Sequence, residues 1–150
     1  MENFQLINFI MTIRQLSIFM ENKPGNLNDV LAVLAENNIN ISSLTVADTD
    51  EYGIVRLLVS DPETAQKKLR EQQFTVRIHD VLSLEMDPQP GSLFKIMHYF
   101  AEAGISIEYV YAFSYGSKSI VVFRTNNREK ALEVIKENNL KPVREVDLKQ

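Results

Sequence analysis

Two short segments of the chain are alike: residues 21–27 read ENKPGNL and residues 87–93 read DPQPGSL. They lie 66 residues apart, and sliding the sequence against itself by that distance aligns residues 14–73 with residues 80–139 without a gap. Fifteen of the sixty aligned pairs are identical, against roughly one in sixteen expected by chance for such a composition. A fixed internal period marks a repeated structural unit. We therefore interpret the chain as two copies of one fold.

The first copy alternates between strand and helix patterns. Leu16, Ile18 and Met20 alternate with other residues, as in a half-buried strand. Asp61 followed by Pro62 and Glu63 is typical of a helix N-terminus. The expected elements are a strand over 14–20, a helix from about 27 to 36, strands over 39–47 and 54–59, a helix from 61 to about 72, and a strand over 74–80.

The second copy repeats this order. Its expected elements are a strand over 81–86, a helix over 91–103, strands over 105–114 and 119–125, a helix capped by Asn127, and a strand over 140–146. The order β-α-β-β-α-β, twice, predicts an α+β protein made of two tandem ferredoxin-like units, each an antiparallel sheet with helices on one face.

The repeat also sets the expected domain boundaries. Residues 14–80 form one domain and residues 81–150 the other, while residues 1–13 are an N-terminal extension or an extra strand. Freely moving domains are usually joined by a polar, Gly- or Pro-rich tether. No such linker separates the copies around Asp80, so we expect them to pack rigidly side by side.

Composition narrows the classes of function. The chain has no cysteine and a formal net charge of −4, and its 16 basic residues are scattered. The lack of cysteine excludes thiol catalysis and fits a cytoplasmic location. Nucleic-acid binding usually requires a basic patch, and the apolar N-terminus is too short to span a membrane. We therefore expect neither a nucleic-acid partner nor a membrane partner.

The two Pro-Gly segments, which we call the elbows, have the chemistry of an anion site. Glycine permits a tight turn and the close approach of another group. The helix that follows begins with unpaired backbone N–H groups and a partial positive charge, which favour a carboxylate. A Pro-Gly pair before a helix is also a common way to turn a chain, so a purely structural role stays open.

The elbows and the segments that follow them resemble the ACT domain. The similarity lies in a strand, an acidic residue, x-x-Pro-Gly-x-Leu, a helix, and then NINI at 38–41 or GISI at 104–107. It covers about residues 14–146. The resemblance implies regulatory modules of amino-acid metabolism that pair side by side and bind an amino acid at the seam. The implied ligand-binding residues are Asn22, Lys23, Pro24, Gly25, Asn26, Leu27, Asn40 and Ile41 in the first copy, and Pro88, Gln89, Pro90, Gly91, Ser92, Leu93, Ser106 and Ile107 in the second.

The copies differ within this set. Asn40 is matched by Ser106 and Lys23 by Gln89. One working site and one degenerate site is therefore an alternative to two equal sites.

An aromatic row predicts a contact surface. Tyr109, Tyr111, Phe113 and Tyr115 alternate along one strand and share a face. Val121 and Phe123 are expected to face the helices, which puts the aromatic row, with Ile120 and Val122, on the sheet face that the helices leave bare. A large exposed apolar patch usually marks an interaction surface. We therefore predict a homodimer through this open face, with cover by the N-terminal extension as the alternative.

No residue set indicates catalysis or a cofactor. His79 and His98 lack the spacing of a metal site, so no metal is expected. We predict a non-catalytic sensor that binds an amino acid at the interface between the repeats. The alternatives are a regulatory subunit that docks on an enzyme of amino-acid metabolism and a ligand-independent interaction module.

Overall fold

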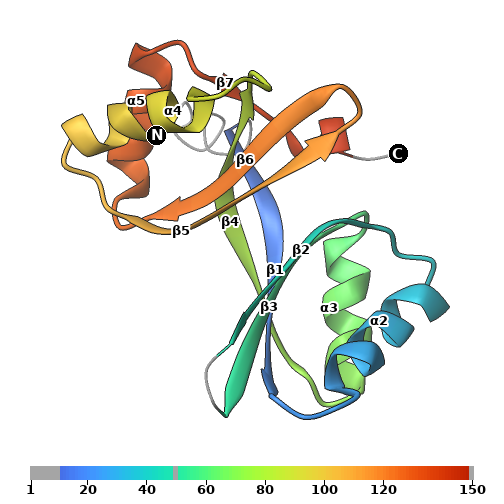
Figure 1. Cartoon of the computed structure of the whole chain (residues 1–150). Coiled ribbons are helices and arrows are strands. Elements are labelled where there is room, and N and C mark those ends of the chain that lie inside the picture. The colour runs from blue at the N-terminus through green and yellow to red at the C-terminus, as the bar shows by residue number, and fades with distance from the viewer. Residues whose placement is uncertain (1–10, 49–50, 149–150) are drawn as a thin grey trace. The chain divides into compact units, whose positions relative to one another are not determined.

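The computed structural model describes residues 11–48 and 51–148. The chain divides into two compact units (Figure 1): Arg14–Asp80, which we call the N-terminal repeat, and Val81–Leu148 with residues 11–13, which we call the C-terminal repeat. The extension expected over residues 1–13 lies outside the described residues except for its last three, of which Thr12 and Ile13 begin the first strand.

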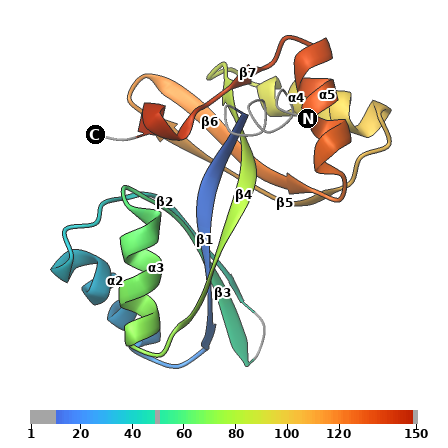
Figure 2. The same cartoon turned by 180° about the vertical axis from the view of Figure 1, so that it is seen from behind.

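The N-terminal repeat has the predicted order of elements, and its strands lie in the order β2-β3-β1-β4. Figures 1 and 2 show its two helices on one face of this sheet. The elements are β1 (Thr12–Glu21), α2 (Asn26–Glu36), β2 (Ile41–Asp48), β3 (Tyr52–Val59), α3 (Pro62–Glu71) and the first half of β4 (Thr75–Met86).

The C-terminal repeat begins with the second half of β4, and its strands lie in the order β5-β6-β4-β7. Its further elements are α4 (Ser92–Glu102), β5 (Ile107–Tyr115), β6 (Lys118–Thr125), α5 (Arg128–Glu137), β7 (Lys141–Pro142) and a 3-10 helix (Glu145–Leu148). The chain is thus two ferredoxin-like units, as the sequence predicts.

Each repeat has its own hydrophobic core between sheet and helices. In the N-terminal repeat Leu16 pairs with Leu57 across β1 and β3, and both are fully buried. In the C-terminal repeat Leu82 pairs with Phe123, whose ring packs edge-on against Phe100 with 5.0 Å between centroids. The alternation of the strands places these side chains on the helix face of each sheet.

The two predicted helix caps are confirmed. The Asp61 carboxylate accepts a hydrogen bond from the Thr64 amide at 3.1 Å. The Asn127 side-chain oxygen accepts one from the Lys130 amide, also at 3.1 Å. Each cap satisfies one of the N–H groups that a helix start leaves unpaired.

The last predicted strand, 140–146, is wrong in extent. Only Lys141–Pro142 is a strand, although the Val143 amide still donates to the Ser83 carbonyl at 2.9 Å. The chain then turns, because the Asp147 carboxylate accepts from both the backbone and the guanidinium of Arg144. These hydrogen bonds from Arg144 lower the pKa of Asp147. This local bonding favours the 3-10 turn over further pairing.

The aromatic row has the predicted register but not the predicted exposure. Tyr111 pairs with Val122 and Phe113 with Ile120, so these residues do share a face. However, Ile120 and Val122 are only 1% and 0% exposed, and the aromatic side chains are half-buried. Part of the cover comes from the C-terminal segment, because Pro142, Val143 and Leu148 line one cavity with Tyr115 and Ile120. The expected open patch is therefore wrong at these positions.

Candidate ligand-binding site

Both elbows adopt the same turn. In the N-terminal elbow the Asn26 amide donates to the Lys23 carbonyl at 3.2 Å, and Gly25 has φ 88° and ψ −17°. In the C-terminal elbow the Ser92 amide donates to the Gln89 carbonyl at 3.2 Å, and Gly91 has φ 87° and ψ −6°. Proline at the second position and a positive-φ glycine at the third define a type II turn.

The glycines are required by this conformation and not by crowding. A Cβ atom added to Gly25 or Gly91 would have no atom within 4 Å. The space above each turn is therefore open, and the elbow residues are exposed or, for Asn26, Leu27 and Ser92, half-buried. No side chain of the protein fills either bend in the described chain.

Each elbow presents open backbone donors at the start of a helix. After the turn-closing amides of Asn26 and Ser92, the next amides with acceptors inside the repeat are those of Asp29, which donates to the Gly25 carbonyl, and Lys95, which donates to the Gly91 carbonyl. The backbone amides of Leu27 and Asn28 have no hydrogen-bond acceptor among the described residues. The same holds for the amides of Leu93 and Phe94. These N–H groups lie at the positive end of α2 or α4 and can hold an anion.

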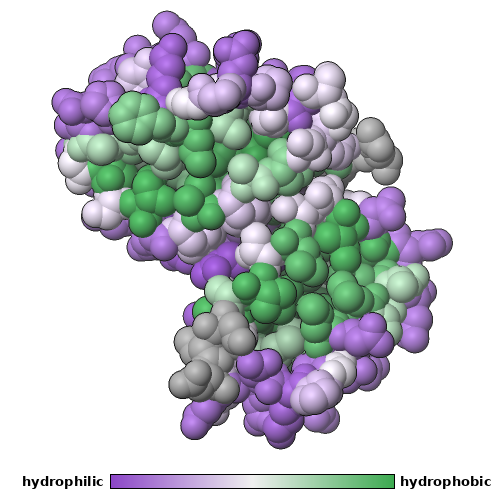
Figure 3. Space-filling model, viewed as in Figure 1, coloured by the Kyte–Doolittle hydropathy of each residue, from purple (hydrophilic) through white to green (hydrophobic). Residues whose placement is uncertain are grey.

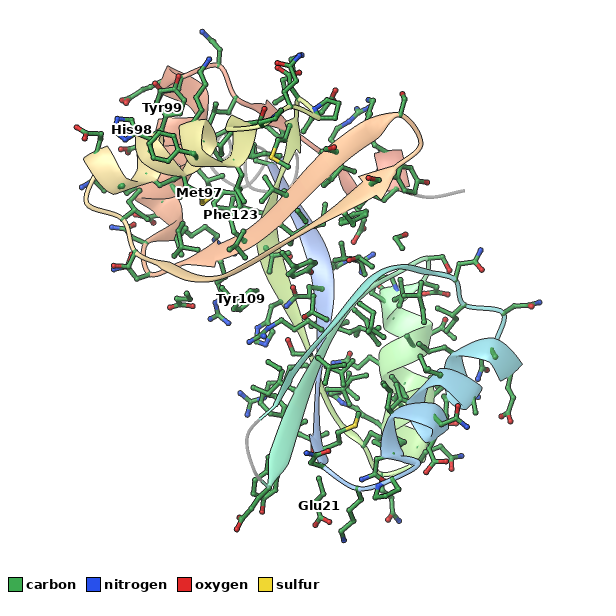
Figure 4. All side chains as sticks on the ribbon, in the orientation of Figure 1. Glu21, Met97, His98, Tyr99, Tyr109 and Phe123 are labelled. Atoms are coloured by element: carbon green, nitrogen blue, oxygen red, sulfur yellow. The ribbon has the colours of Figure 1, made fainter. Side chains whose placement is uncertain are left out.

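Side chains brace the N-terminal elbow. The Asn26 side-chain amide donates to the Glu21 carbonyl at 2.8 Å, and Lys23 forms an ion pair with the Glu21 carboxylate. The hydrogen bond to Glu21, together with its charge, raises the pKa of Lys23. The Asn22 amide donates to the Glu51 carbonyl at 3.0 Å. Three of the predicted ligand contacts therefore already hold the loop in place; Glu21 is labelled in Figure 4.

The C-terminal elbow has the same backbone bonds but not these braces. The Gln89 amide donates to the Asp87 carbonyl at 2.8 Å, as the Lys23 amide does to Glu21 at 2.9 Å. Within residues 81–148 no side-chain hydrogen bond or ion pair involves Asp87, Gln89 or Ser92. Pro88 and Pro90 are exposed. The polar side chains of this elbow remain available.

The segments before β2 and β5 are held by two residues that the sequence reading missed. The Asn40 amide donates to the Ser60 hydroxyl at 3.0 Å, and the Ser60 amide donates back to the Asn40 carbonyl at 2.9 Å. Ser106 and Asn126 form the equivalent pair at 3.0 and 3.2 Å. Residues 60 and 126 are 66 apart, so the repeat itself could have indicated them.

One repeat alone does not bring its predicted contacts together. Glu21, beside the elbow, pairs with Tyr52, whereas Ile41 pairs with Val59 at the other end of β3. These positions are seven residues apart along the strand, which is about 24 Å. In the C-terminal repeat Met86 pairs with Ser119 and Ile107 with Thr125, which separates elbow and strand start by about 20 Å. A site that uses both segments needs two repeats.

The described residues contain no cluster of three or more His, Cys, Asp or Glu side chains able to hold a metal. His98 stacks on Phe94 and lies 3.8 Å from Glu102 on the exposed side of α4. No helix within the described ranges is long and apolar enough to cross a membrane.

Comparison with known proteins assigns the family. The family model described as "ACT domain pair" matches residues 11–150. The chain is also similar to protein BT0572 from Bacteroides thetaiotaomicron, with 41% identity and a TM-score of 0.87 over 93% of this chain and 96% of that one. The fold and both elbows thus define a tandem pair of ACT domains. This chain belongs to the ACT domain pair family.

More distant structures share the fold. The regulatory subunit of aspartate kinase from Thermus thermophilus is 16% identical, with a TM-score of 0.58 over 85% of this chain and 93% of that one. A structure of aspartokinase alpha and beta subunits is 22% identical, with a TM-score of 0.53 over 87% and 98%. A search of curated proteins finds no match.

Proposed function

We propose that this protein is a non-catalytic regulatory protein that binds an amino acid at its elbows. The observation that carries the proposal is the pair of type II turns, each followed by two backbone amides without an acceptor in the described chain. A carboxylate on these amides would gain roughly 0.3–1 kcal/mol per exposed contact. A useful affinity therefore requires further contacts to the same ligand.

Those further contacts are expected from a second repeat. Asn40 and Ser106 have exposed side chains, and their backbones are fixed by Ser60 and Asn126. Each lies about 20 Å or more from the elbow of its own repeat. We propose that an elbow and a strand start from different repeats, in one chain or in two, enclose the ligand.

A homodimer remains part of the proposal, with a changed contact surface. Three exposed apolar residues lie on the helix side of the edge strands: Leu44 and Val46 in β2 are 38% and 51% exposed, and Val110 in β5 is 42% exposed. Phe94 on α4 is 76% exposed. Figure 3 shows hydrophobic surface over these elements in both repeats. An edge strand with an apolar flank favours pairing with another chain.

A thermal-shift screen of the full chain against the twenty amino acids tests the proposed function. Ligand at 100 times its dissociation constant should add about 2.7 kcal/mol to the free energy of unfolding, and hence a clear rise in Tm. An unchanged Tm with every amino acid would favour a ligand-independent module instead.

The second candidate is a regulatory subunit that docks on an enzyme of amino-acid metabolism. The reason to test this candidate is that the chain shares its fold with the regulatory subunit of aspartate kinase. Affinity capture from a cell extract, with and without the amino acid found in the screen, separates the two. Capture of one enzyme in stoichiometric amount would support a docking subunit. If no enzyme is captured, the result supports a sensor that acts without an enzyme partner.

A further inference from the structure

The C-terminal repeat has a cavity of about 210 Å³ beside its elbow. Its walls include Asp87 and Ser92 from the ends of the elbow, Lys95 and Tyr99 from α4, and Lys141 from β7. Figure 4 labels Tyr99 on α4. Pockets for drug-sized ligands measure about 300–1,000 Å³. This smaller cavity suits a molecule the size of an amino acid.

Two acidic and two basic side chains line the cavity, and one of the acidic ones is paired with a lysine outside it. Neither Lys95 nor Lys141 has an ion-pair partner in the described part of the chain, and neither does Asp87. Glu85 also lines the cavity, but its carboxylate forms an ion pair with the Lys118 ammonium at 3.4 Å. Two ammonium groups and one carboxylate remain. This set is complementary to a ligand with two carboxylates and one ammonium group.

The N-terminal repeat does not have this charge pattern. Its corresponding groove, of about 300 Å³, is lined by Asp29 where the C-terminal cavity has Lys95, and Glu36 adds a second carboxylate. Thr75 occupies the position equivalent to Lys141. No elbow residue from 21 to 27 lines this groove. Acidic walls would repel a carboxylate, so the groove does not suit the same ligand.

We propose that the cavity of the C-terminal repeat binds an acidic amino acid, once per chain. The amides of Leu93 and Phe94 hold the α-carboxylate, as in the proposed function, Lys95 and Lys141 hold the side-chain carboxylate, and Asp87 accepts hydrogen bonds from the ligand ammonium. Charge-assisted hydrogen bonds of this kind are about twice as strong as neutral ones. The inference rests on the proposed function, because it assigns the class of amino acid and the repeat that binds it.

The test is titration calorimetry of the full chain with L-glutamate and L-aspartate, and with L-glutamine and L-asparagine as uncharged analogues of the same shape. We expect one acidic amino acid to bind with one site per chain, and its amide to bind at least about tenfold more weakly. Lys95→Asp, which introduces the residue of the N-terminal repeat, should weaken binding by about tenfold or more. Lys67→Asp, the same charge change on the exposed face of α3, should leave the affinity unchanged.

Equal affinities for the acid and its amide, or an unchanged affinity in Lys95→Asp, would overturn the inference. The melting temperature of each variant without ligand shows whether it is folded. If a neutral amino acid binds and Lys95→Asp has no effect, this inference fails while the proposed function stands. If no amino acid of the twenty binds, both fail.

Discussion

The two repeats share their backbone at the elbow and differ in the bonding of the polar side chains around it. Gly25 and Gly91 have nearly identical φ angles, and both turns close with a 3.2 Å hydrogen bond. In the N-terminal repeat Glu21, Lys23 and Asn26 bond to one another or to the loop. The C-terminal elbow leaves its side chains open beside a cavity. We propose that the shared turn supplies a general anion contact, while the side chains around it decide which repeat selects a ligand.

The largest expected difference between the repeats is in the unfolding free energy that a core substitution removes. Leu34 and Phe100 occupy equivalent positions, and both are buried. Phe100→Ala should cost about 3–5 kcal/mol of unfolding free energy, because it also removes the ring contact with Phe123. Leu34→Ala should cost about 2–5 kcal/mol and less than Phe100→Ala. Urea denaturation measures both, and a larger loss for Leu34→Ala would contradict the comparison.

Substitution of the elbow glycines should separate the repeats by function. Gly25→Asp and Gly91→Asp each add a negative charge at a positive φ, so each should strain its turn and repel a carboxylate. If the C-terminal repeat binds the ligand, Gly91→Asp should abolish the binding seen by calorimetry and Gly25→Asp should weaken it less.

Lys67→Asp is the charge control, because it adds negative charge on the exposed face of α3, outside both elbows. Its affinity for the ligand should equal that of the parent protein. Full binding in both elbow variants would show that the elbows do not hold the ligand.

The smallest expected difference between the repeats is in the unfolding free energy that each helix cap contributes. Asp61 and Asn127 make the same hydrogen bond, but only Asp61 brings a negative charge to the helix start. Asp61→Ala and Asn127→Ala should each lower the unfolding free energy by about 0.5–2 kcal/mol. We expect the larger loss for Asp61→Ala at low salt and near-equal losses at high salt. A salt-independent difference in chemical denaturation would exclude the charge as its cause.

The sequence predicted features that are local or periodic. The alternation of strands such as β1, the caps at Asp61 and Asn127, and the glycine turns follow from nearby residues, and the two-fold fold follows from the 66-residue repeat. The resemblance on the Pro-Gly segments gave the family, which the match over residues 11–150 confirms.

The features that the sequence did not predict depend on residues distant in the chain. Ile120 and Val122 are buried because other parts of the chain cover their face of the sheet. The alternation of residues within a strand does not show what covers each face. The bonds of Ser60 and Asn126 join two loops twenty residues apart. The cavity beside the C-terminal elbow gathers Asp87, Lys95 and Lys141 from three separate elements. No spacing rule along the sequence indicates such a set.

The most direct test is to observe the elbow amides while ligand is added. In ¹⁵N–¹H spectra of the full chain, titrated with the amino acid that raises Tm, the amide signals of Leu93 and Phe94 should shift with the affinity found by calorimetry. A carboxylate hydrogen-bonded to these amides would cause that shift, whereas the amides in the middle of α5 should not move. Saturating binding that leaves the signals of Leu93, Phe94, Leu27 and Asn28 unchanged would contradict the account.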